Sequence, residues 1–160
     1  MSEYLYLSKA MLKKLKDELH EMKTVKRPEL SEKIATARDF GDLKENAEYH
    51  AAKEELGLLE SRISQMEGKI SMARVIDPKS ISTDKVAIYT TVSLNDLKRK
   101  MKVQFSLVSP EESDFAKKRI SYTSPVGKAL LGKEVGEAVE VKVPAGIMKY
   151  EVLKIEAYEE

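Results

Sequence analysis

A repeating pattern of apolar residues in the first half of the chain limits its possible folds more than any other feature. Between residues 52 and 73, apolar side chains recur at alternating spacings of four and three, the a/d seam of a coiled-coil helix kept over three heptads. The seam residues are Ala52, Leu56, Leu59, Ile63, Met66, Ile70 and Ala73. An earlier stretch has the same pattern at Leu12, Leu15, Leu19 and Met22, and again at Leu30, Ile34 and Ala37. The phase slips at Pro28, where we expect a kink or a break because proline lacks an N–H donor.

Two such seams, joined by the short segment 38–42, can bury their apolar edges only against each other. They predict an N-terminal domain, residues 1–77, that is an antiparallel coiled-coil hairpin with its tip near Gly41. At about 1.5 Å per residue, a helix from Lys9 to Ala37 is roughly 44 Å long, whereas a small domain is about 30 Å across. We therefore expect an arm whose tip projects into space.

The second half of the chain changes to an alternating apolar pattern, which is typical of strands. The alternating residues are Val86, Ile88 and Val92, then Val103, Phe105 and Leu107, then Val139, Val141 and Val143, and finally Tyr150, Val152 and Ile155. One short helix is predicted between them, with Ser124 as N-cap, Pro125 at its first position and Gly132 at its end. We predict a C-terminal α+β domain, residues 78–160, with an antiparallel sheet and a boundary at Asp77 and Pro78.

Composition and charge exclude several classes of function. The absence of cysteine rules out disulfides, thiolate catalysis and Cys-bearing zinc sites. A net charge of +1 argues against a sequence-wide attraction to nucleic acid or to a membrane. No apolar run is long enough to span a bilayer, and the first residues lack the pattern of an export signal, so we expect a cytoplasmic protein without membrane contact. His20 and His50 have no obvious partners and favour ordinary surface roles.

Carboxylates are concentrated at the predicted tip, residues 39–48. Asp42 and Glu45 are three residues apart, so at a helix start their oxygens can converge, and carboxylates with water are the ligands that Mg²⁺ prefers. Two carboxylates leave most of an octahedral shell unfilled, so such a site needs further ligands from a partner. The same residues also fit a capping box, in which Asp42 caps the second helix and Glu45 reaches back. Both interpretations remain open.

Residues 34–53 closely resemble the tip of the bacterial Gre transcript cleavage factors, in the form found in the GreA branch of that family. Three further segments resemble the same family, namely 26–29, 75–78 and 124–136, so the resemblance spans nearly the whole chain. The family has threonine where this chain has Ser8, and often a proline before it that is missing here. Ser8 can still cap the first helix.

The resemblance implies an N-terminal coiled-coil hairpin, a C-terminal domain of FKBP-like topology, and a monomeric cofactor rather than an enzyme. In the family, the C-terminal domain docks on bacterial RNA polymerase and the hairpin passes down the secondary channel to the active centre. There the acidic pair, which corresponds to Asp42 and Glu45, helps to hold a second Mg²⁺ and stimulates hydrolysis of the 3′ end of backtracked nascent RNA. DNA binding is likewise implied only by the resemblance.

The resemblance also suggests roles for residues around the acidic pair and in the C-terminal domain. Arg38, Lys44 and Asn46 are expected to position the tip or the RNA, although an ion pair with a carboxylate such as Asp42 would equally explain Arg38. The segment expected to contact the polymerase is Ser124, Pro125, Val126 and Gly127. Two other functions remain as alternatives: a regulator that enters the channel without promoting cleavage, and a metal nuclease that acts without polymerase.

Overall fold

The computed structural model describes residues 4–159 and divides into two compact units. The first unit comprises Leu12–Ala73, which we call the arm, together with Tyr4. The second unit comprises Leu5–Met11 and residues 74–159, so the first three residues of the helix α1 (Lys9–Glu21) group with the C-terminal fold. The outermost residues of the two predicted domains, 1–3 and 160, lie outside the described residues.

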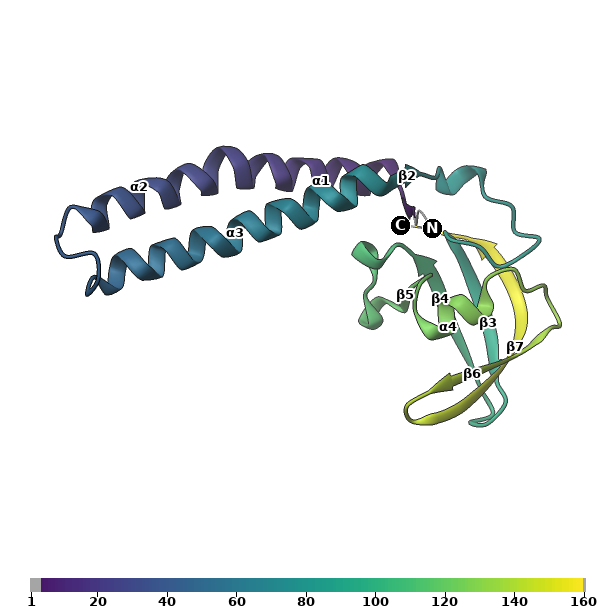
Figure 1. The fold of residues 1–160 in the computed structure, drawn as a ribbon. Helices are drawn as coiled ribbons and strands as arrows, with labels where there is room; N and C mark the ends of the chain where they lie inside the picture. The colour runs from purple at the N-terminus through teal and green to yellow at the C-terminus, as the bar shows by residue number, and fades with distance from the viewer. Residues whose placement is uncertain (1–3, 160) are drawn as a thin grey trace. The chain divides into compact units, whose positions relative to one another are not determined.

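The arm consists of two helical segments that run antiparallel to each other (Figure 1). The first segment contains α1 (Lys9–Glu21) from Leu12 onward, a π-helical turn (Met22–Lys26) and α2 (Arg27–Arg38), and the second is α3 (Ala47–Met72). Ser8 caps α1 as expected, since its Oγ accepts a hydrogen bond from the N–H of Met11 at 3.1 Å.

Pro28 does not break the first helix, in contrast to one of the predicted outcomes. It lies in the first turn of α2, directly after the π-helical turn, where the N–H of Arg27 bonds to the carbonyl oxygen of Met22. A proline ring clashes with the carbonyl of the preceding helical turn, and the wider π turn accommodates the ring without ending the helix.

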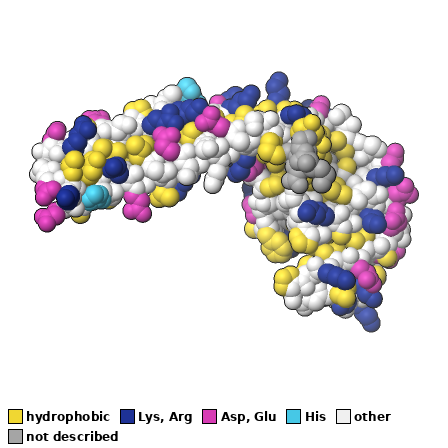
Figure 2. Space-filling view, in the orientation of Figure 1, with side chains coloured by type: hydrophobic (Ala, Val, Ile, Leu, Met, Phe, Trp, Pro, Cys, Tyr) yellow, Lys and Arg dark blue, Asp and Glu magenta, His cyan; other side chains and the backbone are white. Residues whose placement is uncertain are grey.

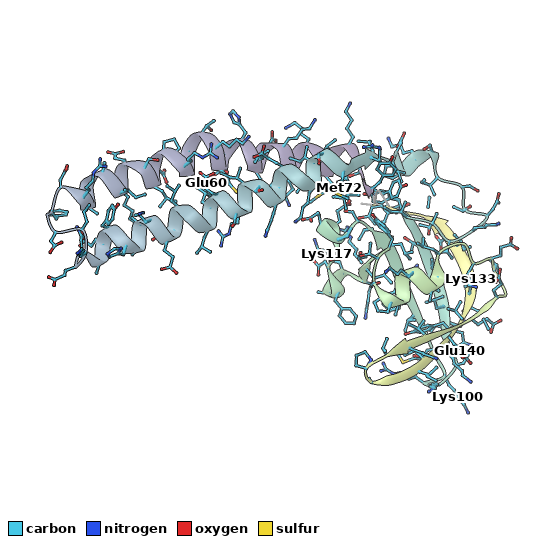
Figure 3. The ribbon with its side chains drawn as sticks, viewed as in Figure 1. Glu60, Met72, Lys100, Lys117, Lys133 and Glu140 are labelled. Atoms are coloured by element: carbon cyan, nitrogen blue, oxygen red, sulfur yellow. The ribbon has the colours of Figure 1, made fainter. Side chains whose placement is uncertain are left out.

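Residues of both predicted seams form an apolar core between the two helical segments. Met22, Leu59 and Ile63 form the centre of this core, and Leu15, Ala37 and Ala52 are also buried. Ion pairs flank the seam, and the guanidinium of Arg27 makes a bidentate contact with Glu60 at 2.7 and 2.9 Å. Glu60 is labelled on α3 in Figure 3. The arm is therefore a helical hairpin in which part of the predicted seam is buried, while Leu56, Met66 and Ile70 are half-buried. Its coiled-coil character stays a prediction.

The second unit is built on a curled five-stranded sheet in the order β5-β4-β3-β7-β6. Its strands are β3 (Thr90–Asp96), β4 (Met101–Val108), β5 (Arg119–Ser121), β6 (Ala138–Val143) and β7 (Gly146–Ala157). The single short helix α4 (Pro125–Leu130) contributes Leu130 to the core that the sheet forms. The resemblance of this topology to FKBP stays a prediction.

Three features of the second unit differ from the sequence-based expectation. β4 and β5 are parallel, so the sheet is not purely antiparallel. Val86 and Ile88 precede β3 and lie outside any strand, because the chain turns at the buried Tyr89, whose φ is +62°. A two-stranded sheet of β1 (Leu5–Leu7) and β2 (Ala73–Val75) and short 3-10 helices at Pro78–Ser80, Pro110–Glu112 and Phe115–Lys117 were also not predicted.

Candidate functional site

The loop between α2 and α3, residues 39–46, carries most of the side chains predicted to form the site. Gly41 turns the chain there with a φ of +118°, a conformation that L side chains rarely adopt. A Cβ at Gly41 would meet no atom within 4 Å, so the backbone conformation, not crowding, explains the glycine. The loop is longer than the predicted segment 38–42, because α3 begins only at Ala47.

Asn46 determines where α3 begins. Its Oδ1 accepts a hydrogen bond from the N–H of Tyr49 at 3.0 Å, and its Nδ2 donates to the carbonyl oxygen of Ala37 at 2.6 Å. One side-chain amide thus caps α3 and ties its start to the end of α2. The predicted capping box with Asp42 as N-cap is wrong, since Asp42 lies in the loop and its Oδ1 accepts from the N–H of Lys44 at 3.1 Å.

Asp42 and Glu45 line one open hollow of about 430 Å³ at the loop end of the arm. Both side chains are exposed, and across residues 4–159 neither has an ion-pair partner. Figure 2 shows acidic side chains gathered at this end of the arm. Glu48 lines the same hollow and was not singled out from the sequence, although its spacing of three from Glu45 was an available signal.

The hollow offers oxygen ligands, which suit Mg²⁺ better than a transition metal. Within the described part of the chain, no group of three or more His, Cys, Asp or Glu side chains has an arrangement that could hold a metal ion. The carboxylates of Asp42 and Glu45 can therefore supply part of an octahedral shell, and the other ligands must come from water or from a partner.

Arg38 and Lys44 are exposed on the loop side of the arm. The alternative ion pair between Arg38 and Asp42 is not observed, and Arg38 has no ion pair with any residue that the structure describes. Lys44 is held by its backbone, because its carbonyl oxygen lies 3.2 Å from Nε2 of His50. His50, for which the sequence favoured an ordinary surface role, therefore contacts the loop that carries the acidic pair.

The predicted polymerase-contact segment forms the start of α4 and serves the fold of the second unit. The Oγ of Ser124 accepts from the N–H of Gly127 at 3.1 Å and donates to the carbonyl oxygen of Ser121 at 2.6 Å. Gly127 is buried, and a Cβ there would stand 2.2 Å from that same oxygen. Val126 packs against the core, so Pro125 is the residue of the four that is exposed.

Comparison with known proteins identifies the family. Residues 5–75 match the model described as "Transcription elongation factor, N-terminal", and residues 81–157 match "Transcription elongation factor, GreA/GreB, C-term". The transcription elongation factor GreA of Chloroherpeton thalassium is 56% identical over 97% of this chain and 98% of its own length. The chain belongs to the GreA/GreB family of transcription elongation factors. GreA of Chlorobium phaeovibrioides is 51% identical and GreA of Flavobacterium johnsoniae 48% identical, with the same coverage of both chains.

Among solved structures, the GreA-type chain is similar to the transcription factor Gfh1, with 27% identity, a TM-score of 0.48, and coverage of 97% of this chain and 99% of the other. A second structure, GreA factor homolog 1 from Thermus thermophilus, gives 26% identity and a TM-score of 0.46, with coverage of 97% and 100%.

Both candidate surfaces of this GreA-type factor lie inside the matched ranges, the acidic hollow in the first and the start of α4 in the second. The relatives are named as factors and not as catalysts of a reaction. None of the helices between residues 4 and 159 has the length and apolar character that crossing a bilayer requires.

Proposed function

We propose that this GreA-type factor stimulates bacterial RNA polymerase to hydrolyse nascent RNA whose 3′ end has backtracked. In this proposal the arm enters the secondary channel of the polymerase, and the loop between α2 and α3 reaches the active centre. The observation that supports the proposal most directly is the pair of exposed carboxylates, Asp42 and Glu45, in one hollow at the loop end of the arm.

The construction of the arm suits insertion into a channel. α3 has 26 residues, which corresponds to about 39 Å at 1.5 Å per residue. The buried seam around Ile63 holds the two helical segments together, and the Arg27–Glu60 ion pair links their surfaces. A two-helix rod of this kind can carry its loop deep into a partner while its own core remains intact.

The proposed chemistry divides the work between the two proteins. Asp42 and Glu45, with ligands from the polymerase, would hold a Mg²⁺ ion, which when bound would activate the attacking water or stabilise the leaving oxygen. Asp42 and Glu45 offer carboxylate oxygens to that ion and raise its local affinity, while Asn46 keeps the loop in place through its two hydrogen bonds. Arg38 and Lys44 present exposed positive charge that suits RNA phosphates. The chain then acts as a cofactor, and the products are a short 3′ fragment and a new RNA 3′ end.

The test compares purified polymerase, halted in a backtracked state on RNA labelled at its 3′ end, with and without the factor. The variants are Asp42→Asn, Glu45→Gln and the double variant, with Asp39→Asn as the matched control because Asp39 is an exposed loop residue outside the hollow. Binding to polymerase is measured in parallel by competition with the wild-type factor.

We expect the wild-type factor and Asp39→Asn to accelerate fragment release equally. Each hollow variant should lose about a hundredfold in rate, the size of effect seen when one electrostatic stabiliser is removed from an active site, while binding stays unchanged. Full stimulation by the double variant would refute the metal-binding role. Slower nucleotide addition without any fragments would favour a regulator of the channel, and cutting without polymerase would favour a nuclease.

We further propose that the start of α4 contributes to docking on polymerase, with Pro125 as the exposed contact. Pro125→Ala should weaken binding while leaving the maximal rate of fragment release unchanged at saturating factor. Lys128→Ala, on the same short helix and also exposed, serves as the comparison. Equal binding of Pro125→Ala and wild type would exclude this contact.

A further inference from the structure

His50 contacts the acidic loop, and the proposed function does not use it. Its Nε2 lies 3.2 Å from the carbonyl oxygen of Lys44, although the two residues are six positions apart. The imidazole also meets the edge of the Tyr49 ring, with centroids 5.6 Å apart and planes at 63°. The ammonium of Lys53 lies 5.3 Å from the centroid of the same tyrosine ring. The first turn of α3 thus holds the His50 ring on one side while its Nε2 faces the loop.

Lys44, whose carbonyl oxygen makes this contact, lies between Asp42 and Glu45 in the sequence. The N–H of Lys44 donates to Oδ1 of Asp42 at 3.1 Å, and its carbonyl oxygen faces His50. The carbonyl of Lys44 and the N–H of Glu45 belong to one planar peptide unit. A hydrogen bond that fixes this carbonyl therefore also fixes the plane from which Glu45 extends.

We propose that His50 is a positioning residue for the acidic pair: its Nε2–H donates to the Lys44 carbonyl and holds the Lys44–Glu45 peptide so that Glu45 stays beside Asp42. A carbonyl oxygen only accepts, so the ring nitrogen must carry the proton. The neutral Nε2–H tautomer and the imidazolium both meet this requirement. The proposal rests on the proposed function of the acidic pair and extends it to a residue outside the hollow.

The reach of the side chain provides a matched set of variants. Glutamine places its amide nitrogen three bonds beyond Cβ, as histidine places Nε2, whereas asparagine places its amide nitrogen only two bonds beyond Cβ. His50→Gln should keep the contact with Lys44, and His50→Asn should lose it while remaining polar. His20→Asn is the control for the same substitution at an exposed position on α1, away from the loop.

The contact itself is tested by NMR on the full-length factor without polymerase. We expect a proton on Nε2 of His50, and a change in the carbonyl ¹³C shift of Lys44 in His50→Asn that is absent in His50→Gln and His20→Asn. A bare Nε2 in the wild type, or an unchanged Lys44 carbonyl in His50→Asn, would overturn the proposal. This measurement does not depend on whether the factor stimulates cleavage.

The effect on the acidic pair is tested by titrating Mg²⁺ in the backtracked-complex assay. Losing one hydrogen bond of ordinary strength changes a conformational population about twofold to tenfold. His50→Asn should therefore raise the Mg²⁺ concentration for half-maximal fragment release about twofold to tenfold, with the rate at saturating Mg²⁺ close to wild type. His50→Gln and His20→Asn should match the wild type.

The outcomes separate this proposal from the proposed function. If Asp42→Asn abolishes stimulation but His50→Asn titrates like the wild type, His50 has no positioning role and the proposed function stands. Equal shifts in His50→Gln and His50→Asn would also overturn the proposal, because the reach of the donor would not matter. If the wild-type factor releases no fragments, the proposed function fails, and the NMR comparison alone decides whether His50 holds the loop.

Discussion

Replacing Asn46 with alanine removes two hydrogen bonds made by one side chain. The Oδ1 of Asn46 caps α3 at the N–H of Tyr49, and its Nδ2 bonds to the carbonyl oxygen of Ala37 at the end of α2. Loss of an N-cap costs about 1 kcal/mol, and loss of an intramolecular hydrogen bond costs about 1 kcal/mol more. Asn46→Ala should therefore destabilise the closed loop by about 2 kcal/mol, which corresponds to roughly a thirtyfold change in population.

The variant Asn46→Asp separates the energetic contributions of the two Asn46 hydrogen bonds. A carboxylate keeps the N-cap hydrogen bond and interacts favourably with the positive end of the α3 dipole, but it cannot donate a hydrogen bond to the Ala37 carbonyl. Hydrogen exchange by NMR at the amides of Tyr49 and His50, with Ile63 in the middle of α3 as the reference, measures local opening. We expect exchange to be slowest in the wild type, faster in Asn46→Asp and fastest in Asn46→Ala. Equal exchange in the wild type and Asn46→Ala would show that other contacts hold the loop and would refute this reasoning.

Two further predictions concern stability. Gly127→Ala should lower the free energy of unfolding of the second unit by about 1–3 kcal/mol, because its Cβ would stand 2.2 Å from the Ser121 carbonyl oxygen. Gly68→Ala should instead stabilise the arm by up to about 1 kcal/mol, because a Cβ at Gly68 on α3 would meet open space. Urea unfolding followed by near-UV circular dichroism of the tyrosines tests Gly127→Ala, and unfolding followed by far-UV circular dichroism tests Gly68→Ala. An unchanged free energy of unfolding in Gly127→Ala would contradict the clash. Burial raises the pKa of the Tyr89 hydroxyl above its ordinary value of about 10, and the hydrogen bond to the carboxylate of Glu112 raises it further. The contribution of the neutral Tyr89 hydroxyl to stability is therefore complete below about pH 10 and is lost as the pH rises further. Tyr89→Phe should flatten this loss in unfolding curves recorded across that range, and an unchanged slope would assign it to other groups.

Local and periodic features were the ones that the sequence predicted well. The two antiparallel helical segments of the arm, the cap at Ser8 and the capped start of α4 at Ser124 all appear in the structure. Each depends on side chains within one or two helical turns of each other, so a short window of sequence contains the whole cause.

The start of α3 illustrates where local reasoning fails. Asp42 and Asn46 are both good N-cap residues, and the spacing from Asp42 to Glu45 resembles a capping box. The choice depends on Ala37, nine residues before Asn46, because its carbonyl oxygen accepts the second hydrogen bond of the Asn46 amide. Similarly, no sequence window indicates that β5 runs parallel to β4.

The amino-acid sequence alone therefore determined the two-helix arm, the strand-rich second half and the acidic character of the loop, because these follow from apolar periodicity and from residue types in one short segment. Only the tertiary structure decided that Asp42 and Glu45 precede α3, that they line one hollow, and that His50 reaches the peptide between them. The physical reason is that the path of a loop is set by where the helices on both sides end, and those ends are held by hydrogen bonds that cross the loop, such as the one from Asn46 to the carbonyl oxygen of Ala37.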